Sequence, residues 1–283
     1  MEKQNTEIKV KKNTGELVPF DESKLKEALS RSGAAERDIE RVSKEVEAAL
    51  YDGITTKKIY QIAYNKLRKL SHRSAGRYRL KKALFQLGPS GFPFEHFVAR
   101  LFEMQGFQVE TGKIIQGRCV QHEVDMAARK QGEIIMAECK FHQSEGAKSD
   151  VKTSLYVRSR FTDILDRLQT EEEESFRFQP MLITNTRFTT DAMQYGKCSG
   201  LQLISWDYPQ GSSLKDLIDR SGLHPITVLK SLTKKETKAL MDRGIVLCRE
   251  IAEKPELLNP LTIPQRRLNN ILKEAQALVR EKN

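Results

Sequence analysis

The four-residue break at 88–91, Gly-Pro-Ser-Gly, is the sequence feature that most constrains this chain, because it separates two segments with different hydrophobic patterns. Before the break, apolar residues recur mainly at helical spacing. After it, short apolar runs typical of strands alternate with helical segments. A second break, at 208–211, precedes a stretch with helical spacing only. The sequence therefore predicts three domains, at residues 1–88, 89–210 and 211–283.

The three predicted domains differ in fold. Alternation and a turn signal over residues 8–20 predict a β-hairpin, and the rest of the first domain is mostly helical. The middle domain has an α/β layout with a mixed sheet, in which we expect strands at about 107–111, 119–127, 133–140, 181–184 and 201–206. The last domain is a small all-α domain, with a capping box at Thr233-Lys234-Lys235-Glu236. We assign the whole chain to the α/β class.

The charge of the chain is distributed unevenly. Forty-eight lysines and arginines against 38 aspartates and glutamates give a formal net charge of +10. By count, residues 1–88 and 211–283 carry +8 and +5, whereas residues 89–210 carry −3. Basic ends around an acidic centre suit a protein that holds a polyanion at its ends and a metal ion at its centre. A charge that only keeps the protein in solution explains the composition equally well.

Composition also excludes several classes of protein. A hydrophobic fraction of 39% supports a packed core and argues against global disorder. No apolar run approaches the ~20 residues of a membrane span, and no secretory signal follows the first methionine. The four cysteines form no C-x-x-C pair, which argues against a zinc ribbon or a disulfide framework. We therefore expect a cytoplasmic protein with no membrane partner.

Four residues of the middle domain carry the side chains that phosphodiester hydrolysis needs: Glu95, Asp125, Glu138 and Lys140. Glu138 and Lys140 are two apart on one predicted strand, so they share a face. Carboxylates hold Mg²⁺, the metal polarises the phosphate, and a lysine orients or deprotonates the attacking water. Glu95 could approach from one edge of its predicted helix. On the residues alone, a cross-strand ion pair is an alternative explanation.

The order of these residues resembles that of the Mrr-type restriction endonucleases, a branch of the restriction-endonuclease-like nucleases. Asp125 followed by Glu138-Cys139-Lys140 is similar to the metal-binding core of that family, and about 120 residues follow the family's order. Many members have a glutamine where this chain has Glu138. The resemblance implies a metal-dependent endodeoxyribonuclease with Asp125, Glu138, Lys140 and Glu95 as catalytic residues. Asp125, Glu138 and Glu95 would be the ligands of Mg²⁺ or Mn²⁺.

Other residues near this core are candidates for contacts with DNA. Lys152, Arg158 and Arg160 lie on a helix predicted over about 149–169, from which they could follow the DNA backbone. His142 shares a strand face with Lys140 and could touch a phosphate. A solvated helix face, and a polar residue that closes a strand, explain these residues equally well.

Lysines gather near the N-terminus, at positions 9, 11, 12 and 24. They flank a predicted tight turn or lie in the first turn of a helix, where free backbone N–H groups also attract phosphate. The segments 10–15, 19–25 and 51–60 resemble the signatures of the ATP-cone, the regulatory nucleotide-binding domain best known from ribonucleotide reductases. Residues 77–84 resemble its closing helix.

The resemblance to the ATP-cone implies a regulatory site for an adenine nucleotide, ATP or dATP. The adenine would lie near Val10 and Ile59, and the phosphates would lie on Lys12 and Lys24. Asn13 stands where the family usually has an arginine, which puts one phosphate contact in question. The nucleotide-binding residues that the resemblance implies are Val10, Lys11, Lys12, Asp21, Lys24, Thr56, Ile59 and Tyr60.

The predicted helices after residue 210 are less informative. Residues 231–251 faintly resemble a helix-hairpin-helix unit, which can donate backbone N–H groups to a DNA phosphate. The usual Gly-x-Gly hairpin is missing, so a helical packing or oligomerisation module explains the segment at least as well.

Together the two resemblances imply a Mg²⁺-dependent DNA endonuclease of the Mrr type, regulated by an adenine nucleotide and acting in defence against foreign DNA. Cutting both strands takes two active sites, so we expect a homo-oligomer with an even number of subunits. One alternative is a nucleotide-responsive DNA-binding regulator with an inactive nuclease fold, although a pure binder does not need Asp125, Glu138 and Lys140 together. Another is a nuclease that acts on RNA or branched DNA.

Overall fold

The computed structural model describes residues 8–279 except 13 and 172–175. The described residues form two compact units, one made of 8–80 with 276–279 and the other of 81–275. The break at 88–91 and the predicted boundary at 210 therefore both lie within the second unit. None of the described helices has the length and apolar character needed to cross a membrane.

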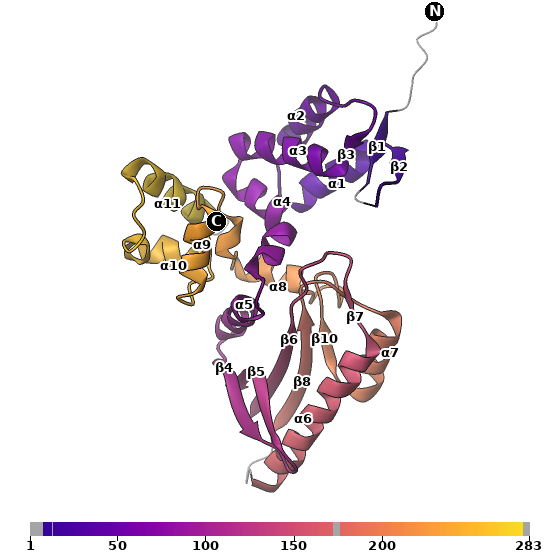
Figure 1. Cartoon of the computed structure of the whole chain (residues 1–283), viewed down its shortest axis with the longest axis vertical. Helices are drawn as coiled ribbons and strands as arrows, with labels where there is room; N and C mark the ends of the chain where they lie inside the picture. Colours follow the sequence, from indigo (N-terminus) through magenta and orange to yellow (C-terminus); the bar gives the residue numbers. More distant parts are fainter. Residues whose placement is uncertain (1–7, 13, 172–175, 280–283) are drawn as a thin grey trace, which may run out of the picture. The chain divides into compact units, whose positions relative to one another are not determined.

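The first unit combines a small sheet with several helices (Figure 1). Its strands are β1 (Lys9–Lys11), β2 (Leu17–Pro19) and β3 (Ile54–Thr55), and its helices are α1 (Glu22–Arg31), α2 (Glu36–Glu47), α3 (Thr56–Leu70) and the first part of α4 (His72–Leu84). The sheet order is β2-β1-β3, with β1 antiparallel to β2 and parallel to β3. The predicted hairpin is confirmed, whereas β3, only two residues long, was not predicted.

Local sequence explains where the helices of the first unit begin. The side chain of Asp21 accepts a hydrogen bond from the backbone N–H of Lys24 at the start of α1, and Thr55 does the same at the start of α3. Leu29, Val42 and Leu67 are fully buried at the centre of the unit. Apolar residues at helical spacing therefore supply its core.

The second unit is built on a five-stranded mixed sheet with the order β10-β8-β6-β5-β4. The strands are β4 (Gln108–Gln116), β5 (Gln121–Lys130), β6 (Glu133–Lys140), β8 (Arg177–Thr184) and β10 (Gln202–Ile204). The pairs β4–β5 and β5–β6 are antiparallel, whereas β6–β8 and β8–β10 are parallel. The short strands β7 (Lys148–Ser149) and β9 (Arg187–Phe188) form a separate parallel pair.

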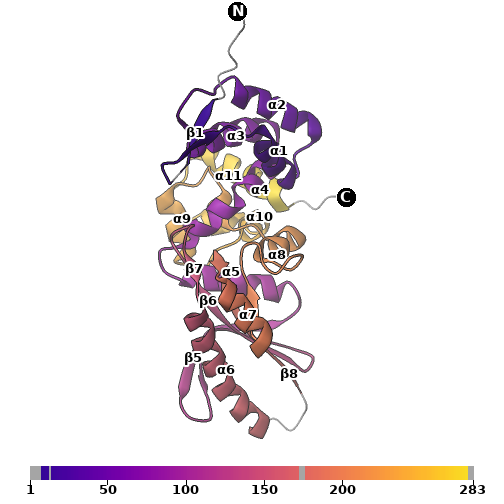
Figure 2. The same ribbon diagram turned by 90° about the vertical axis from the view of Figure 1, so that its right-hand side faces the viewer.

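Three helices accompany this sheet: α5 (Phe92–Glu103), α6 (Val151–Glu171) and α7 (Thr190–Ser199). Helices α6 and α7 lie along one face of the sheet (Figures 1 and 2), where Phe161, Leu182 and Leu203 contribute to a buried core. Each of these two helices crosses between parallel strands, which a short turn cannot connect. The α/β fold with a mixed sheet that the sequence predicts is confirmed.

The remaining elements of the second unit are helical. They are α8 (Leu214–Ser221), α9 (Lys234–Met241), α10 (Cys248–Glu253), most of α11 (Gln265–Val279), and the 3₁₀ turns η1 (Phe85–Leu87), η2 (Ile226–Val228) and η3 (Pro255–Leu258). The predicted capping box of Thr233 and Glu236 begins α9. The buried carboxylate of Glu274 accepts hydrogen bonds from the backbone N–H groups of Lys230 (3.2 Å) and Ser231 (3.0 Å), which ties α11 to the turn before α9.

Candidate active site

The ladder between β5 and β6 stops just before Asp125, near the middle of β5, and Glu138, near the end of β6. The pairing of the two strands ends at Met126, opposite Ala137. Beyond that point β5 remains paired with β4, and β6 remains paired with β8 to its last residue. The two strands therefore part at this end of the sheet. We call Glu95, Asp125, Glu138 and Lys140, which gather there, the carboxylate site.

Side chains take the place of ladder hydrogen bonds at the parted strands. Oδ2 of Asp125 on β5 accepts a hydrogen bond from the backbone N–H of Cys139 on β6, over 2.7 Å. Arg160 of α6 donates from Nη1 to Oε2 of Glu138 over 2.7 Å, and from Nη2 to the backbone oxygen of Glu123. One carboxylate and one guanidinium therefore bridge the two strands.

Glu95 reaches the site from the first turn of α5, which Phe94 and Phe97 anchor as fully buried side chains. A Cβ atom on residue 91 would lie 2.7 Å from Oε1 of Glu95, so Gly91 leaves room for this carboxylate. Lys140 is exposed at the end of β6, two residues beyond Glu138. The catalytic and metal-binding roles of these four residues stay predictions.

Burial raises the pKa of all three carboxyl groups, and the charge of a neighbouring acid adds to the effect in each case. Burial, and then the charges of Asp125 and Glu138, raise the pKa of Glu95 to about 7. Burial raises the pKa of Asp125, although the N–H of Cys139 and the charge of Arg160 act in the opposite direction. Burial, and then the charge of Asp125, raise the pKa of Glu138. Buried carboxyl groups whose ionisation is disfavoured by burial and by nearby negative charge form a site that gains from a bound cation.

The chemistry of these residues fits a hard divalent cation. Glu95, Asp125 and Glu138 offer only oxygen ligands, which Mg²⁺ prefers, and a cation would relieve their repulsion. Among the described residues, however, no three side chains of Asp, Glu, His or Cys are already drawn together as a metal-binding group. One oxygen of Glu138 is instead held by Arg160.

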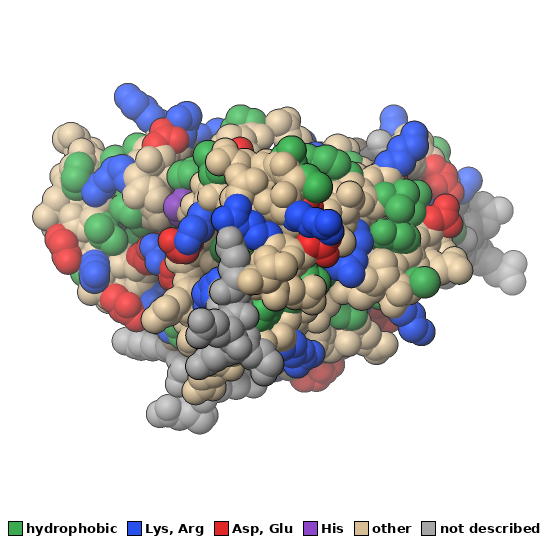
Figure 3. Space-filling view, turned by 90° about the horizontal axis from the view of Figure 1, so that it is seen from below, with side chains coloured by type: hydrophobic (Ala, Val, Ile, Leu, Met, Phe, Trp, Pro, Cys, Tyr) green, Lys and Arg blue, Asp and Glu red, His purple; other side chains and the backbone are tan. Residues whose placement is uncertain are grey.

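The residues predicted to contact DNA have different surroundings. Arg160 points into the carboxylate site, with 12% of its side chain exposed, and not toward the outer face of α6. Lys152 is exposed and Arg158 is half-buried on the same helix, so their contacts with DNA stay predictions. The ring of His142 shares a 3.0 Å hydrogen bond with the hydroxyl of Ser149, and burial lowers its pKa. On the face shown in Figure 3, lysine and arginine side chains are interspersed with acidic ones.

Sequence reasoning missed a polar cluster that fixes the β4–β5 hairpin to α6. Oδ2 of Asp163 on α6 lies 2.7 Å from Nε2 of His122 on β5, and Oδ1 accepts a 2.8 Å hydrogen bond from the backbone N–H of Cys119. These hydrogen bonds, that of His122 first, lower the pKa of Asp163 to about 2. Asp163 lies 41 positions after His122, so no local pattern links them.

The residues predicted to bind a nucleotide fall into two groups at opposite ends of β1. Lys11 pairs with Thr55 on β3, so Thr56, the first residue of α3, belongs to one end. Lys9 pairs with Pro19 on β2, so Asp21, which follows β2, belongs to the other end. A rise of about 3.3 Å per residue places the ends of the three-residue strand roughly 7 Å apart, which a nucleotide can span.

The predicted phosphate ligands already have partners within the protein. Lys12 forms a 3.0 Å ion pair with Glu16, and Lys24 forms a 2.8 Å ion pair with Asp21. The hydrogen bond from Lys24 is the main cause that lowers the pKa of Asp21 to about 2.

The other nucleotide-site predictions have the following surroundings. Val10 and Ile59, predicted beside the adenine, are buried in the core. Tyr60 stacks on Tyr78 with 5.0 Å between ring centroids. Asn13 lies outside the described residues.

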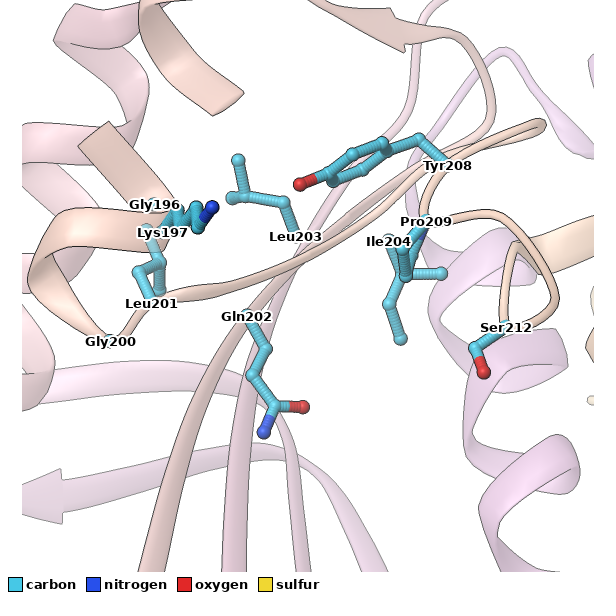
Figure 4. Close-up of a pocket in the computed structure, with 10 residues that line it drawn as sticks. All are labelled: Gly196, Lys197, Gly200, Leu201, Gln202, Leu203, Ile204, Tyr208, Pro209 and Ser212. Carbon is cyan, nitrogen blue, oxygen red and sulfur yellow. The ribbon is translucent and has the colours of Figure 1, made fainter. Parts of the chain in front are cut away.

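A separate pocket of about 420 Å³ lies beside β10 and contains none of the four carboxylate-site residues. Figure 4 shows the ring of Tyr208 extending over β10 toward Leu203 and Lys197, with Gln202 pointing to the other side of the strand. The amide of Gln202 donates a hydrogen bond to Gln179 over 2.6 Å. The pocket is lined by Gly196, Lys197, Gly200, Leu201, Gln202, Leu203, Ile204, Tyr208, Pro209 and Ser212.

Comparison with protein families assigns each part of the chain. The ATP cone domain family matches residues 8–82, a restriction endonuclease family matches residues 88–208, and the family described as AF1548-like, C-terminal, matches residues 224–279. The solved structure MspJI Restriction Endonuclease in Complex with 27-mer Oligonucleotide is 13% identical, with a TM-score of 0.35 over 71% of this chain and 39% of that one. Similarity at that level supports no conclusion about this chain.

Two further matches cover nearly the whole length of the related proteins. An uncharacterized protein of Archaeoglobus fulgidus is 33% identical over 183 residues, which are 64% of this chain and 99% of the relative. The crystal structure of the protein of unknown function AF1548 is 32% identical, with a TM-score of 0.55 over 67% of this chain and 98% of that one. This chain therefore belongs to the family of the Archaeoglobus fulgidus relative, and it joins an ATP-cone to a restriction-endonuclease domain of the Mrr type.

Proposed function

We propose that this protein is a metal-dependent DNA endonuclease of the Mrr type, with its active site at the parted ends of β5 and β6. The observation that carries the proposal is that three carboxyl groups from α5, β5 and β6 have pKa values raised by burial, and that the charges of Asp125 and Glu138 act on Glu95. Glu95, Asp125 and Glu138 would hold Mg²⁺ or Mn²⁺. A bound ion of this kind would supply positive charge to the scissile phosphate and acidity to a water molecule.

The contribution of the protein's own residues is mainly positional. The N–H of Cys139 fixes Asp125, and Arg160 fixes Glu138, so the two strands present their carboxylates in a set orientation. Lys140 extends from the same strand face as Glu138 into solvent, where its ammonium group would orient the attacking water and contact the phosphate. Strand packing holds these groups in place before the substrate binds. Little conformational entropy is therefore lost when they adopt the geometry that the reaction needs.

We further propose that ATP or dATP on the ATP-cone regulates cleavage. The lysines expected to hold the phosphates, Lys12 and Lys24, form exposed ion pairs with Glu16 and Asp21. Exposed pairs of this kind are weak, so a polyphosphate can replace them at small cost. An even-numbered homo-oligomer, a cytoplasmic location and a role in defence against foreign DNA complete the proposal.

A plasmid-cleavage assay with the full chain tests the proposed activity. We expect supercoiled DNA to be cut with Mg²⁺ or Mn²⁺ and to stay intact in excess EDTA, with a different rate when ATP or dATP is added. Cleavage that persists in EDTA would overturn the proposal. The same assay with RNA and with branched DNA tests those substrates as alternatives.

A second candidate function is a nucleotide-responsive DNA-binding regulator. The ion pair between Arg160 and Glu138 favours it, because it neutralises one of the three candidate ligands without a metal. A regulator of this kind would bind DNA in the presence of Mg²⁺ and leave every substrate intact. Gel-shift measurements beside the cleavage assay separate the two functions.

A further inference from the structure

We propose that Arg160 is a positioning residue, which joins the parted ends of β5 and β6 so that Glu138 presents its second oxygen to the metal ion. The inference rests on the proposed function, because it assigns Arg160 a role relative to that ion. It concerns a residue that the sequence pattern had placed on the DNA-contacting face of its helix.

The contacts of Arg160 reach both strands at once. Nη1 donates to Oε2 of Glu138 on β6, and Nη2 donates to the backbone oxygen of Glu123 on β5. Beyond the last ladder pair of these strands, this bridge replaces pairing that the backbone no longer provides. With 12% of the Arg160 side chain and 20% of the Glu138 side chain exposed, the ion pair is largely shielded from water.

The geometry of the bridge depends on the shape of a guanidinium group. The two Nη atoms of Arg160 lie in one plane, and each donates a hydrogen bond to a different acceptor. Only Oε2 of Glu138 is engaged by Arg160, so Oε1 is left for another ligand. A lysine would keep the charge but has a single nitrogen on a flexible stem, so it cannot reproduce the planar fork.

The position of Arg160 is itself set by its own helix. One residue further, Phe161 is fully buried in the core of the sheet. Three residues further, Asp163 fixes α6 to the β4–β5 hairpin through His122. One turn earlier, the ring of Tyr156 lies 5.3 Å from the guanidinium carbon. Phe161 and Asp163 therefore fix this part of α6, and the ring of Tyr156 lies beside the guanidinium.

Arg160 could act on the metal site in two ways, by its charge or by orienting Glu138, and the two roles predict opposite changes in metal affinity when the guanidinium is removed. Removing a positive charge beside three carboxylates makes the site more negative, which strengthens the attraction for a divalent cation. Removing a group that orients a ligand weakens metal binding, by about 10- to 100-fold for partners of this kind in other metal sites. The direction of the change therefore distinguishes the two roles.

The experiment measures binding of Mn²⁺ to the full chain by calorimetry, without DNA and without a cleavage readout. The variants are Arg160→Lys and Arg160→Met, and the control is Arg118→Gln. Arg118 also faces a carboxylate of α6, Asp166, but at 3.9 Å and with 73% of its side chain exposed. We expect Mn²⁺ affinity to fall about 10-fold or more in both Arg160 variants and to stay unchanged in the control.

Outcomes of three kinds would overturn the inference, and they are distinguishable. Unchanged Mn²⁺ binding by Arg160→Lys, or tighter binding by Arg160→Met, would show that Arg160 acts through its charge and not through its geometry, and unchanged binding by Arg160→Met would show that it has no role at the metal site. In each case the proposed nuclease function would stand. Absence of Mn²⁺ binding by the wild-type chain would remove the proposed function together with this inference. Loss of folding in both variants, seen as unfolding in metal-free buffer, would make Arg160 a structural residue and not a positioning one.

Discussion

At the scale of single residues, the carboxylate site is defined less by which acids are present than by what each one contacts. Asp125 accepts a backbone N–H from the neighbouring strand, and Glu138 accepts a guanidinium from α6. Glu95 remains the group whose pKa is raised to about 7, because burial and the two neighbouring carboxyl groups act on it together. The three acids therefore differ in their response to substitution and to pH.

We expect Asp125→Ala and Glu138→Ala each to abolish cleavage while leaving DNA binding largely in place, because each removes a candidate metal ligand and leaves other contacts with DNA intact. Lys140→Ala should stop cleavage without weakening metal binding. Plasmid cleavage, gel shift and Mn²⁺ titration measure the three properties. Equal cleavage by wild type and Asp125→Ala would remove this residue from the mechanism.

The raised pKa of Glu95 predicts a pH dependence of stability. Its value in the folded chain, about 7, lies above the ordinary value of 4.5, so the folded state binds the proton more tightly than the unfolded state does. In metal-free protein, the free energy of unfolding should therefore decrease as the pH rises from about 4.5 to about 7. Metal binding should change in the opposite direction, because it requires the ionised carboxylate.

Thermal unfolding in EDTA, from about pH 5 to about pH 8, measures this dependence. Glu95→Gln should flatten the profile, whereas Glu145→Gln, at an exposed position, should leave it unchanged. A Glu95→Gln profile identical to that of wild type would show that another group carries the dependence.

At the scale of elements, the β4–β5 hairpin and α6 depend on each other through Asp163. The carboxylate reaches His122 and the backbone of the turn at Cys119, so the helix that carries Arg160 is tied to the hairpin that carries Asp125. The turn leaves little space for this contact. A Cβ atom on Gly117 would lie 2.1 Å from Oδ2 of Asp163 and 2.9 Å from the backbone oxygen of Val120.

Gly117→Ala should therefore destabilise the protein, by about 1–3 kcal/mol as for other substitutions that overfill a packed site. Gly146→Ala is the matched control, since its Cβ would meet a single atom at 4.0 Å. Denaturant unfolding measures both. Because part of the clash is with Asp163, the double variant Gly117→Ala/Asp163→Ala should lose less than the sum of the single variants, and strict additivity would contradict this account.

At the scale of the whole molecule, the nucleotide-site residues and the carboxylate site belong to different compact units. Helix α4 begins in the first unit and continues into the second, so one element is shared by both. Regulation by a nucleotide then has to act through the arrangement or assembly of the units. Linkage requires that a nucleotide which favours one assembly binds that assembly more tightly.

We expect ATP or dATP to change the oligomer distribution and the cleavage rate together, and Lys24→Ala to weaken both responses through loss of a phosphate contact. A change of about 5- to 150-fold corresponds to roughly 1–3 kcal/mol of coupling. Light scattering and cleavage assays across one nucleotide titration measure it. If the nucleotide changes the cleavage rate while assembly and domain arrangement stay constant, the mechanism is wrong. If it changes neither the cleavage rate nor the assembly, the ATP-cone has a structural role only.

The sequence by itself determined the fold class and the strand face that Glu138 and Lys140 share, because both depend on local patterns. Helical spacing, the Asp21 cap and the Thr233 capping box fix elements within a few residues of themselves. The two-residue period of β6 places Glu138 and Lys140 on one strand face in any structure that keeps that strand. These features can be predicted without knowing how the rest of the chain packs.

Only the tertiary structure decided what Arg160 and Asp163 do. Their sequence position fixes the helix that carries them, but not which neighbour that helix packs against. Arg160 contacts residues 22 and 37 positions earlier, and Asp163 contacts one 41 positions earlier, so these contacts exist only after α6 has crossed the sheet. The same holds for the separation of β5 and β6. Beyond the last pair of their ladder, β5 stays paired with β4 and β6 with β8. No pattern within either strand predicts where this separation begins.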